Sequence, residues 1–214
     1  MNKYVWGAWP AVLALATAAV LTGCEGKDAK DKPASATDTA ATFTDSRDGK
    51  VYRTIGVGGQ VWFAENLNYA AEGSVCYDGE DANCAKHGRL YNWETALKTC
   101  PTGFHLPSDM EWAVLLDYAG GDEKAGTKLR SSTGWDSFSG APVGTDDYGF
   151  STLPGGYSNV DGSFHDADKY GYWWSATKVN ADYAWSRYMG YGYDGVYRRD
   201  DYKRHLFSVR CVQD

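Results

Sequence analysis

The sequence lacks an apolar run long enough to form a convincing transmembrane helix. Its N-terminal apolar stretch, Val5 to Leu21, is followed at once by small residues, whereas a spanning helix needs about 20 consecutive apolar residues. The sequence also lacks a basic patch, since 28 acidic residues outnumber 21 Lys and Arg residues and the formal net charge is −7. An acidic domain repels phosphate backbones, so we expect no nucleic-acid partner.

Residues 1–23 have the pattern of an export signal. Lys3 precedes the apolar stretch, which ends in Leu21-Thr22-Gly23-Cys24, the residue order of a lipobox. We therefore expect a lipoprotein signal peptide that is cleaved before Cys24, with acyl chains, palmitate among them, on that cysteine. A plain secretory signal with a chance cysteine is the alternative. Two or more acyl chains anchor a protein stably to a membrane, so the expected location is the cell envelope, at the outer membrane or the cell surface.

Residues 24–42 are expected to form the lipidated cysteine and a flexible linker. Beyond Cys24 the segment is polar or small, with one proline and no large apolar side chain. Such a segment buries too little surface to offset the entropy of ordering. The folded domain is therefore expected over residues 43–214.

Four cysteines remain once Cys24 is assigned to lipid. An even number in an exported chain predicts disulfides, and four cysteines allow three pairings. The most economical pairing joins Cys76 to Cys84 around a polar loop and Cys100 to Cys211 across most of the domain. No pair has Cys-x-x-Cys spacing, and the histidines do not complete a zinc arrangement with them, so we expect no metal and no cofactor.

Two early helices are expected in the domain. Residues 92–98 place apolar side chains on one face at helical spacing. The second helix begins at Ser108, and Glu111 three residues on can complete a capping box. Asp109 and Glu111 could instead be read as paired catalytic acids, but capping and the positive end of the helix explain both carboxylates.

Short apolar runs between turn residues indicate strands. A hairpin is expected over residues 51–63, where Gly-Val-Gly-Gly separates two β-branched and aromatic runs. Later strands are expected over residues 150–157, 173–177, 183–189, 196–199 and 207–212. We see no internal repeat. Two early helices and several late strands favour an α+β domain with two main helices packed on short antiparallel strands.

Other polar residues offer weaker candidates. The acidic loop 161–168 could hold calcium through carboxylate oxygens, but it lacks the spacing of a recognised calcium loop, so a solvated turn is favoured. His165 and His205 have no nucleophile or carboxylate fixed beside them in the sequence, so we interpret both as structural or surface residues.

Three motifs in a fixed order carry a family resemblance. They are Gln60–Tyr69, Cys100–Trp112, and Tyr172–Thr177 together with Phe207–Val212. In combination they closely resemble the Fibrobacter succinogenes major paralogous domain family, over roughly residues 45–214. The resemblance implies an exported, often lipid-anchored domain of unassigned biochemistry.

The same order of motifs also resembles the wider C-type-lectin-like fold. In that fold a long disulfide joins a helix region to the final strand, as a Cys100–Cys211 bond would do here. The chain lacks the Glu-Pro-Asn and Trp-Asn-Asp motifs of calcium-dependent sugar binders. Neither calcium nor carbohydrate is therefore carried over from the resemblance.

An enzyme alternative comes from the same fold group. Its formylglycine-generating oxygenases have a Leu-Pro-Thr-Glu-x-Glu-Trp motif that is similar to Leu106–Trp112 here. Those enzymes hold copper between two free cysteines, whereas the cysteines of this chain are better explained as disulfides. We therefore expect a protein that is not an enzyme.

Between Tyr170 and Tyr202, tyrosines and tryptophans alternate with glycine, serine, aspartate and arginine, a composition typical of recognition surfaces. We expect Trp173, Trp174 and Trp185 to form core. Turn glycines place the tyrosines of the segment Tyr188–Tyr193 in a loop, where they are more available to a ligand. The expected ligand-binding residues are Tyr188, Tyr191, Tyr193, Asp194 and Tyr197. The leading hypothesis is a non-catalytic domain that binds a glycan or a surface protein, and a ligand-free envelope component is a further alternative.

Overall fold

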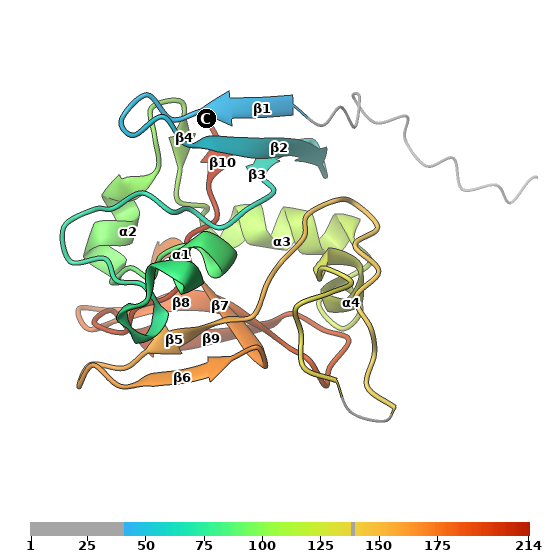
Figure 1. Ribbon diagram of the computed structural model, residues 1–214. Helices are drawn as coiled ribbons and strands as arrows, with labels where there is room; N and C mark the ends of the chain where they lie inside the picture. Colours follow the sequence, from blue (N-terminus) through green and yellow to red (C-terminus); the bar gives the residue numbers. More distant parts are fainter. Residues whose placement is uncertain (1–40, 138–139) are drawn as a thin grey trace, which may run out of the picture. The chain divides into compact units, whose positions relative to one another are not determined.

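The computed structural model describes residues 41–137 and 140–214 (Figure 1). The expected signal peptide, Cys24 and the linker up to residue 40 lie outside this range. Over the described residues the chain forms ten β-strands, four α-helices and a short 3-10 helix, η1 (Tyr77–Gly79). None of these helices has the length and apolar character needed to cross a bilayer.

The first sheet joins strands from the two ends of the domain to β4 from its middle. Its strand order is β1-β2-β3-β10-β4, and the pairs are antiparallel. The strands are β1 (Ala41–Thr44), β2 (Val51–Val57), β3 (Gln60–Phe63), β4 (Phe104–His105) and β10 (Val212–Gln213). The β2–β3 hairpin turns at Gly58 and Gly59, which have φ of +63° and +79°. A two-residue turn of this kind needs positive φ at both positions, and this explains why two glycines separate the strands.

The second sheet comes entirely from the C-terminal third of the chain. Its strand order is β6-β5-β7-β8-β9. The strands are β5 (Gly155–Ser158), β6 (Phe164–Ala167), β7 (Tyr170–Lys178), β8 (Tyr183–Gly190) and β9 (Tyr197–Tyr202). The β5–β7 pair is parallel, through Gly156 and Gly171, and the other pairs are antiparallel.

The helices are short. They are α1 (Asp81–His87), α2 (Trp93–Thr99), α3 (Asp109–Tyr118) and α4 (Ala125–Leu129). The expected capping box of α3 is confirmed: Ser108 Oγ accepts a hydrogen bond from Glu111 N at 3.2 Å, and Glu111 Oε2 accepts one from Ser108 N at 2.7 Å. Asn92 caps α2 by accepting a hydrogen bond from Thr95 N.

Helix α3 lies between the two sheets (Figure 1). Its Trp112 is fully buried in one core cluster with Trp62 of the first sheet and Trp173 of the second. Trp174 is fully buried in a second cluster, where it stacks on Phe207 at 4.4 Å. Trp173 and Trp174 are therefore core, as expected. Trp185 is only partly buried, and the guanidinium of Arg198 covers its ring at 3.3 Å.

The expected fold class is wrong. The structure is mostly β, with two curled five-stranded sheets and few short helices over the described residues, rather than a C-type-lectin-like domain of two main helices packed on short antiparallel strands. Both expected helices exist, but they contribute only 7 and 10 residues. The strands that the sequence did not predict form through pairing between segments that are distant in the chain. The two-residue strands β4 and β10, for example, have no periodic pattern of their own that a sequence argument can detect.

Two disulfides hold the domain, and the expected pairing is confirmed. Cys76 bonds to Cys84, eight residues away, and Cys100 bonds to Cys211, 111 residues away. The long bond ties the end of α2 to the residue before β10, so it fixes the last strand between β3 and β4.

Candidate functional site

A ladder of tyrosines crosses the second sheet. The antiparallel register places Tyr172 of β7 opposite Tyr188 of β8, and Tyr188 opposite Tyr197 of β9. The ring centroids of the first pair are 5.9 Å apart and those of the second 5.2 Å apart, and both pairs are stacked. Cross-strand aromatic pairs of this kind stabilise a sheet while keeping the side chains on one face.

The turn that follows β8 extends the ladder. Tyr170 contacts both Tyr191 and Tyr193, with centroid separations of 6.0 and 6.5 Å. Tyr193 also meets Tyr197 edge to face at 5.7 Å. The rings thus form one continuous surface, which we call the tyrosine surface: Tyr170, Tyr172, Tyr188, Tyr191, Tyr193 and Tyr197.

Exposure increases along the tyrosine surface from the core outwards. Tyr172 is 6% exposed, while Tyr193 is 46% and Tyr197 39% exposed. Tyr188 and Tyr191 are half-buried. The inner rings therefore hold the outer rings in place, and the outer rings face solvent.

Four of the five expected ligand-binding residues lie together on this surface, and Asp194 does not join them. The Asp194 carboxylate accepts a hydrogen bond from Thr127 Oγ1 at 2.7 Å, and its carbonyl accepts one from Thr127 N at 3.0 Å. Asp194 thus ties the turn to α4. Tyr170 and Tyr172 were not among the expected binding residues, although their alternation with small or buried residues in β7 is the signal that could have placed them on one face.

The tyrosine surface offers ring faces and neutral hydroxyl groups. Burial raises the pKa of Tyr170 and of Tyr188, so both hydroxyls keep their protons at neutral pH. The Tyr172 hydroxyl donates a hydrogen bond to Asp166 at 2.8 Å. Chemically, this is a surface for packing and hydrogen bonding rather than for proton transfer.

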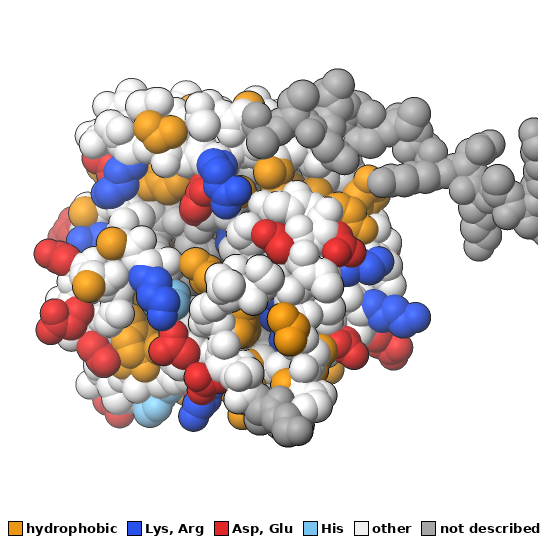
Figure 2. All heavy atoms as spheres, turned by 45° about the vertical axis from the view of Figure 1, so that its right-hand side comes forward, with side chains coloured by type: hydrophobic (Ala, Val, Ile, Leu, Met, Phe, Trp, Pro, Cys, Tyr) orange, Lys and Arg blue, Asp and Glu red, His pale blue; other side chains and the backbone are white. Residues whose placement is uncertain are grey.

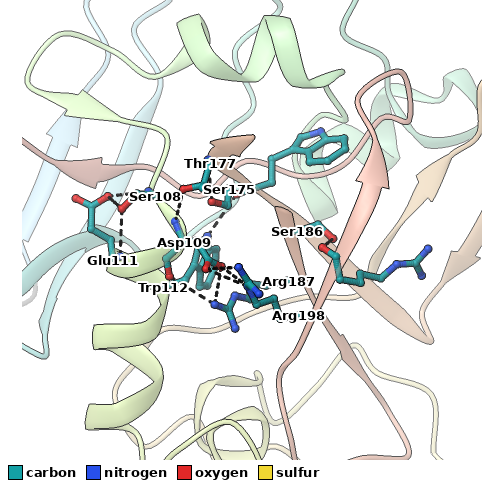
Figure 3. Close-up of polar contacts among 11 residues, drawn as sticks. Ser108, Asp109, Glu111, Trp112, Ser175, Thr177, Ser186, Arg187 and Arg198 are labelled. Atoms are coloured by element: carbon teal, nitrogen blue, oxygen red, sulfur yellow. Dashed lines mark hydrogen bonds and ion pairs between the residues drawn. The ribbon is translucent and has the colours of Figure 1, made fainter. Parts of the chain in front are cut away.

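The acidic residues at the start of α3 are engaged in structural contacts (Figure 3). Asp109 Oδ1 accepts a hydrogen bond from Arg187 at 2.7 Å, and Asp109 Oδ2 pairs with Arg198 at 2.9 Å. Glu111 accepts hydrogen bonds from Ser108 and lies 2.8 Å from His105 Nε2. Both carboxylates are therefore bound to other elements of the fold, which favours their structural interpretation over a catalytic pair.

A serine and a histidine meet in the loop before and within β6, but their geometry is not that of a nucleophilic triad. Ser163 Oγ lies 2.8 Å from His165 Nε2 and 2.5 Å from Asp161 Oδ1. In a triad the carboxylate binds the other imidazole nitrogen and orients the ring. Here the carboxylate binds the serine itself, so the histidine is not oriented as a base.

The described cysteines do not fit the copper site of the oxygenase alternative. That site requires two free thiols, and Cys76, Cys84, Cys100 and Cys211 are all in disulfides. Over residues 41–137 and 140–214 no group of three or more His, Cys, Asp and Glu side chains could hold a metal ion. We derive no catalytic step through copper.

One histidine has a strongly shifted pKa for structural reasons. Burial, aided by the neighbouring Lys86 and opposed by Asp168, lowers the pKa of His87 to about 4. His87 is 4% exposed, and its Nδ1 has no hydrogen-bond partner among the described residues. The ring is thus neutral at neutral pH.

We expect His87 to make the domain less stable in mild acid. Because an unfolded histidine titrates near 6.5, the unfolded chain binds more protons than the folded chain between about pH 6.5 and 4. Stability should therefore fall as pH drops through this window, by up to about 3 kcal/mol. Urea unfolding of His87→Gln between pH 4 and 7 should show a flatter profile than the parent. The exposed His165→Gln is the control and should leave the profile unchanged; equal profiles for all three proteins would contradict the assignment.

The comparisons with known proteins identify a family. The model of the Fibrobacter succinogenes major domain matches residues 55–213. The match covers well over half of the chain, so the chain belongs to this family, and the resemblance seen in the sequence motifs is confirmed. No curated protein and no solved structure matches the chain.

Proposed function

We propose that this family member is a non-catalytic, lipid-anchored domain of the cell envelope that binds a glycan on its tyrosine surface. The observation that carries the proposal is the gathering of six tyrosines, from β7, β8, β9 and the turn between the last two, into one continuous surface with an exposed outer edge. No other function has comparable support from the geometry.

The chemistry of a sugar suits this surface. A pyranose ring has apolar C–H faces that pack on aromatic rings and hydroxyl groups that exchange hydrogen bonds with tyrosine hydroxyls. The exposed rings of Tyr193 and Tyr197 are nearly perpendicular, with an interplanar angle of 83°. They therefore offer one ring face and one ring edge side by side.

The proposal of an envelope location rests on sequence features and the disulfides. The order Leu21-Thr22-Gly23-Cys24 supports lipidation, and the polar segment after it supports a tether. The two disulfides are consistent with an oxidising compartment outside the cytoplasm.

The exposed part of the tyrosine surface provides the test. We expect the full chain to bind neutral oligosaccharides on a glycan array, and the double variant Tyr193→Ala/Tyr197→Ala to bind them at least about tenfold more weakly, since tenfold is only about 1.4 kcal/mol and two aromatic contacts are removed. Calorimetry with the best oligosaccharide from the array gives the ratio of Kd values.

A matched control lies on the same strand. Tyr202 is 42% exposed but points to the opposite face of β9 from Tyr197, because successive residues of a strand alternate between faces. Tyr202→Ala should therefore leave the Kd unchanged.

Two results would overturn the proposal: a glycan array without binding, or equal losses of affinity for Tyr202→Ala and the double variant. If a surface protein is captured and no glycan binds, the tyrosine surface would belong to the protein-ligand hypothesis. The ligand-free alternative predicts buried tyrosines over residues 183–202, which the exposed Tyr193, Tyr197 and Tyr202 do not match.

A further inference from the structure

A pocket of about 480 Å³ shares no lining residue with the tyrosine surface. It lies between the start of β2 and α1, and the segments around Ser131 and Ser151 complete its wall. The face shown in Figure 2 is hollowed, and Lys and Arg side chains (blue) lie beside the hollow. The volume lies within the range of about 300–1,000 Å³ that is usual for small-molecule sites.

A buried guanidinium lines the pocket. Arg210 is 1% exposed, and its hydrogen bonds all go to neutral oxygens: the Asn66 side chain at 3.1 and 3.3 Å, the Phe63 carbonyl at 3.1 Å and the Phe150 carbonyl at 2.6 Å. Within the part of the chain that the structure describes, no carboxylate forms an ion pair with Arg210. Burial lowers the pKa of Arg210 to about 9, so it stays positive at neutral pH.

The other cations around the pocket are already compensated. Lys50 pairs with Asp48 at 2.8 Å, and Lys86 pairs with Asp168 at 2.8 Å. Arg53 pairs with Glu65 at 2.5 Å. Among the pocket cations of the described residues, Arg210 is therefore the one without a direct ion pair, and the carboxylates of Glu65 and Asp146 favour its charge only from a distance. A buried charge without a direct ionic partner is costly to the protein. An anion held in the pocket would offset that cost.

The remaining lining is suited to a hydroxylated molecule. Polar neutral side chains from three separate segments line the pocket: Asn66, Asn68, Ser131, Thr133 and Ser151. Amides and hydroxyls both donate and accept hydrogen bonds, as sugar hydroxyls do. Val51 and Leu153 add apolar wall, which suits the C–H faces of a sugar ring.

We propose that this pocket binds a sugar acid of monosaccharide size, with its carboxylate on the Arg210 side and its hydroxyls against the amide and hydroxyl lining. The site is separate from the tyrosine surface and does not depend on the function proposed for that surface. The competing explanation is that Arg210 only ties together the backbone segments at Phe63 and Phe150. That structural role would persist without any ligand.

The test compares two sugars that differ in the carboxylate. Titration calorimetry of the full chain should show glucuronate binding with a Kd at least about tenfold lower than that of glucose, the equivalent of about 1.4 kcal/mol. Acetate should bind more weakly than glucuronate, because it lacks the hydroxyls. No glucuronate binding, equal binding of glucose, or acetate binding as tight as glucuronate would each overturn the proposal.

Helix α1 supplies a matched pair of variants that spare the core. Ala85 is exposed and lines the pocket, whereas Ala82 is exposed on the same helix and does not. Ala85→Glu places a negative charge at the pocket and should weaken glucuronate binding about tenfold, while Ala82→Glu should change it less than about twofold, because repulsion falls with distance. Arg210→Met should abolish glucuronate binding if the variant folds. If this variant does not fold, the two α1 variants still test the proposal. An unchanged glucuronate affinity in Ala85→Glu would overturn it and leave Arg210 with its structural role alone.

Discussion

Removing the Cys100–Cys211 disulfide is expected to lower the free energy of unfolding by about 5 kcal/mol. The bond closes a loop of 111 residues, so its loss frees a large part of the unfolded chain and raises the entropy of the unfolded state. The test variant is Cys100→Ala/Cys211→Ala. Alanine is used instead of serine because position 211 is fully buried, and serine would place a hydroxyl group there. Urea unfolding under non-reducing conditions measures the difference.

The second disulfide is the control for this prediction. Cys76 and Cys84 are separated by only eight residues, and the same chain-entropy relation gives about 2.5 kcal/mol for Cys76→Ala/Cys84→Ala. The loss should therefore be about twice as large for the long bond as for the short one. Equal losses would show that the bonds act through local packing and not through the length of the loop that they close.

The second large effect is expected at Asp109, which joins α3 to the second sheet. Its carboxylate pairs with Arg187, whose side chain is 3% exposed and whose Nε already lacks a partner among the described residues. Asp109→Ala would leave this buried guanidinium without its ion pair, and we expect a loss of about 3 kcal/mol of stability. Thermal and urea unfolding would measure it.

Two further variants separate the buried pair from the exposed one. Arg198 is 41% exposed in its pair with Asp109, so Arg198→Ala should cost only about 1 kcal/mol, including its contact with the Trp185 ring. The double variant Asp109→Ala/Arg187→Met removes the stranded charge along with its partner and should be more stable than Asp109→Ala alone. If Arg198→Ala proved as costly as Asp109→Ala, the buried pair would not be the source of the effect.

The candidate site shows why the sequence argument reached the right segment and an incomplete site. The density of tyrosine and glycine between Tyr170 and Tyr202 is visible in the sequence, and it predicted four members of the tyrosine surface. Tyr170 and Tyr172 belong to the same surface only because β7 pairs with β8 in one particular register. A shift of one residue would turn their side chains to the other face. Asp194 failed to join because Thr127, 67 residues earlier, binds its carboxylate.

The pocket at Arg210 is a stronger case of the same limit. Its lining comes from the start of β2, the segment after β3, α1, the segments around Ser131 and Ser151, and Arg210, the residue before Cys211. The family motifs Gln60–Tyr69 and Phe207–Val212 contain Asn66 and Arg210, but neither motif indicates that these positions meet the other lining segments in one pocket. In the sequence, Arg210 is an ordinary charged residue near the C-terminus. Only packing buries it against Asn66 and two backbone carbonyls.

Local chemistry was enough for the features that depend on neighbours along the chain. The capping box of Ser108 and Glu111, the glycine turn between β2 and β3, the even set of cysteines and the family motifs could all be recognised from residues a few positions apart. The arrangement of the two sheets could not be recognised from neighbouring residues. Two-residue strands such as β10 acquire their place between β3 and β4 only through hydrogen bonds to distant segments, and the register of β7, β8 and β9 sets which tyrosines share a face. Strand pairing links residues far apart in sequence, so the mostly β architecture and both proposed sites emerge only when the chain is packed.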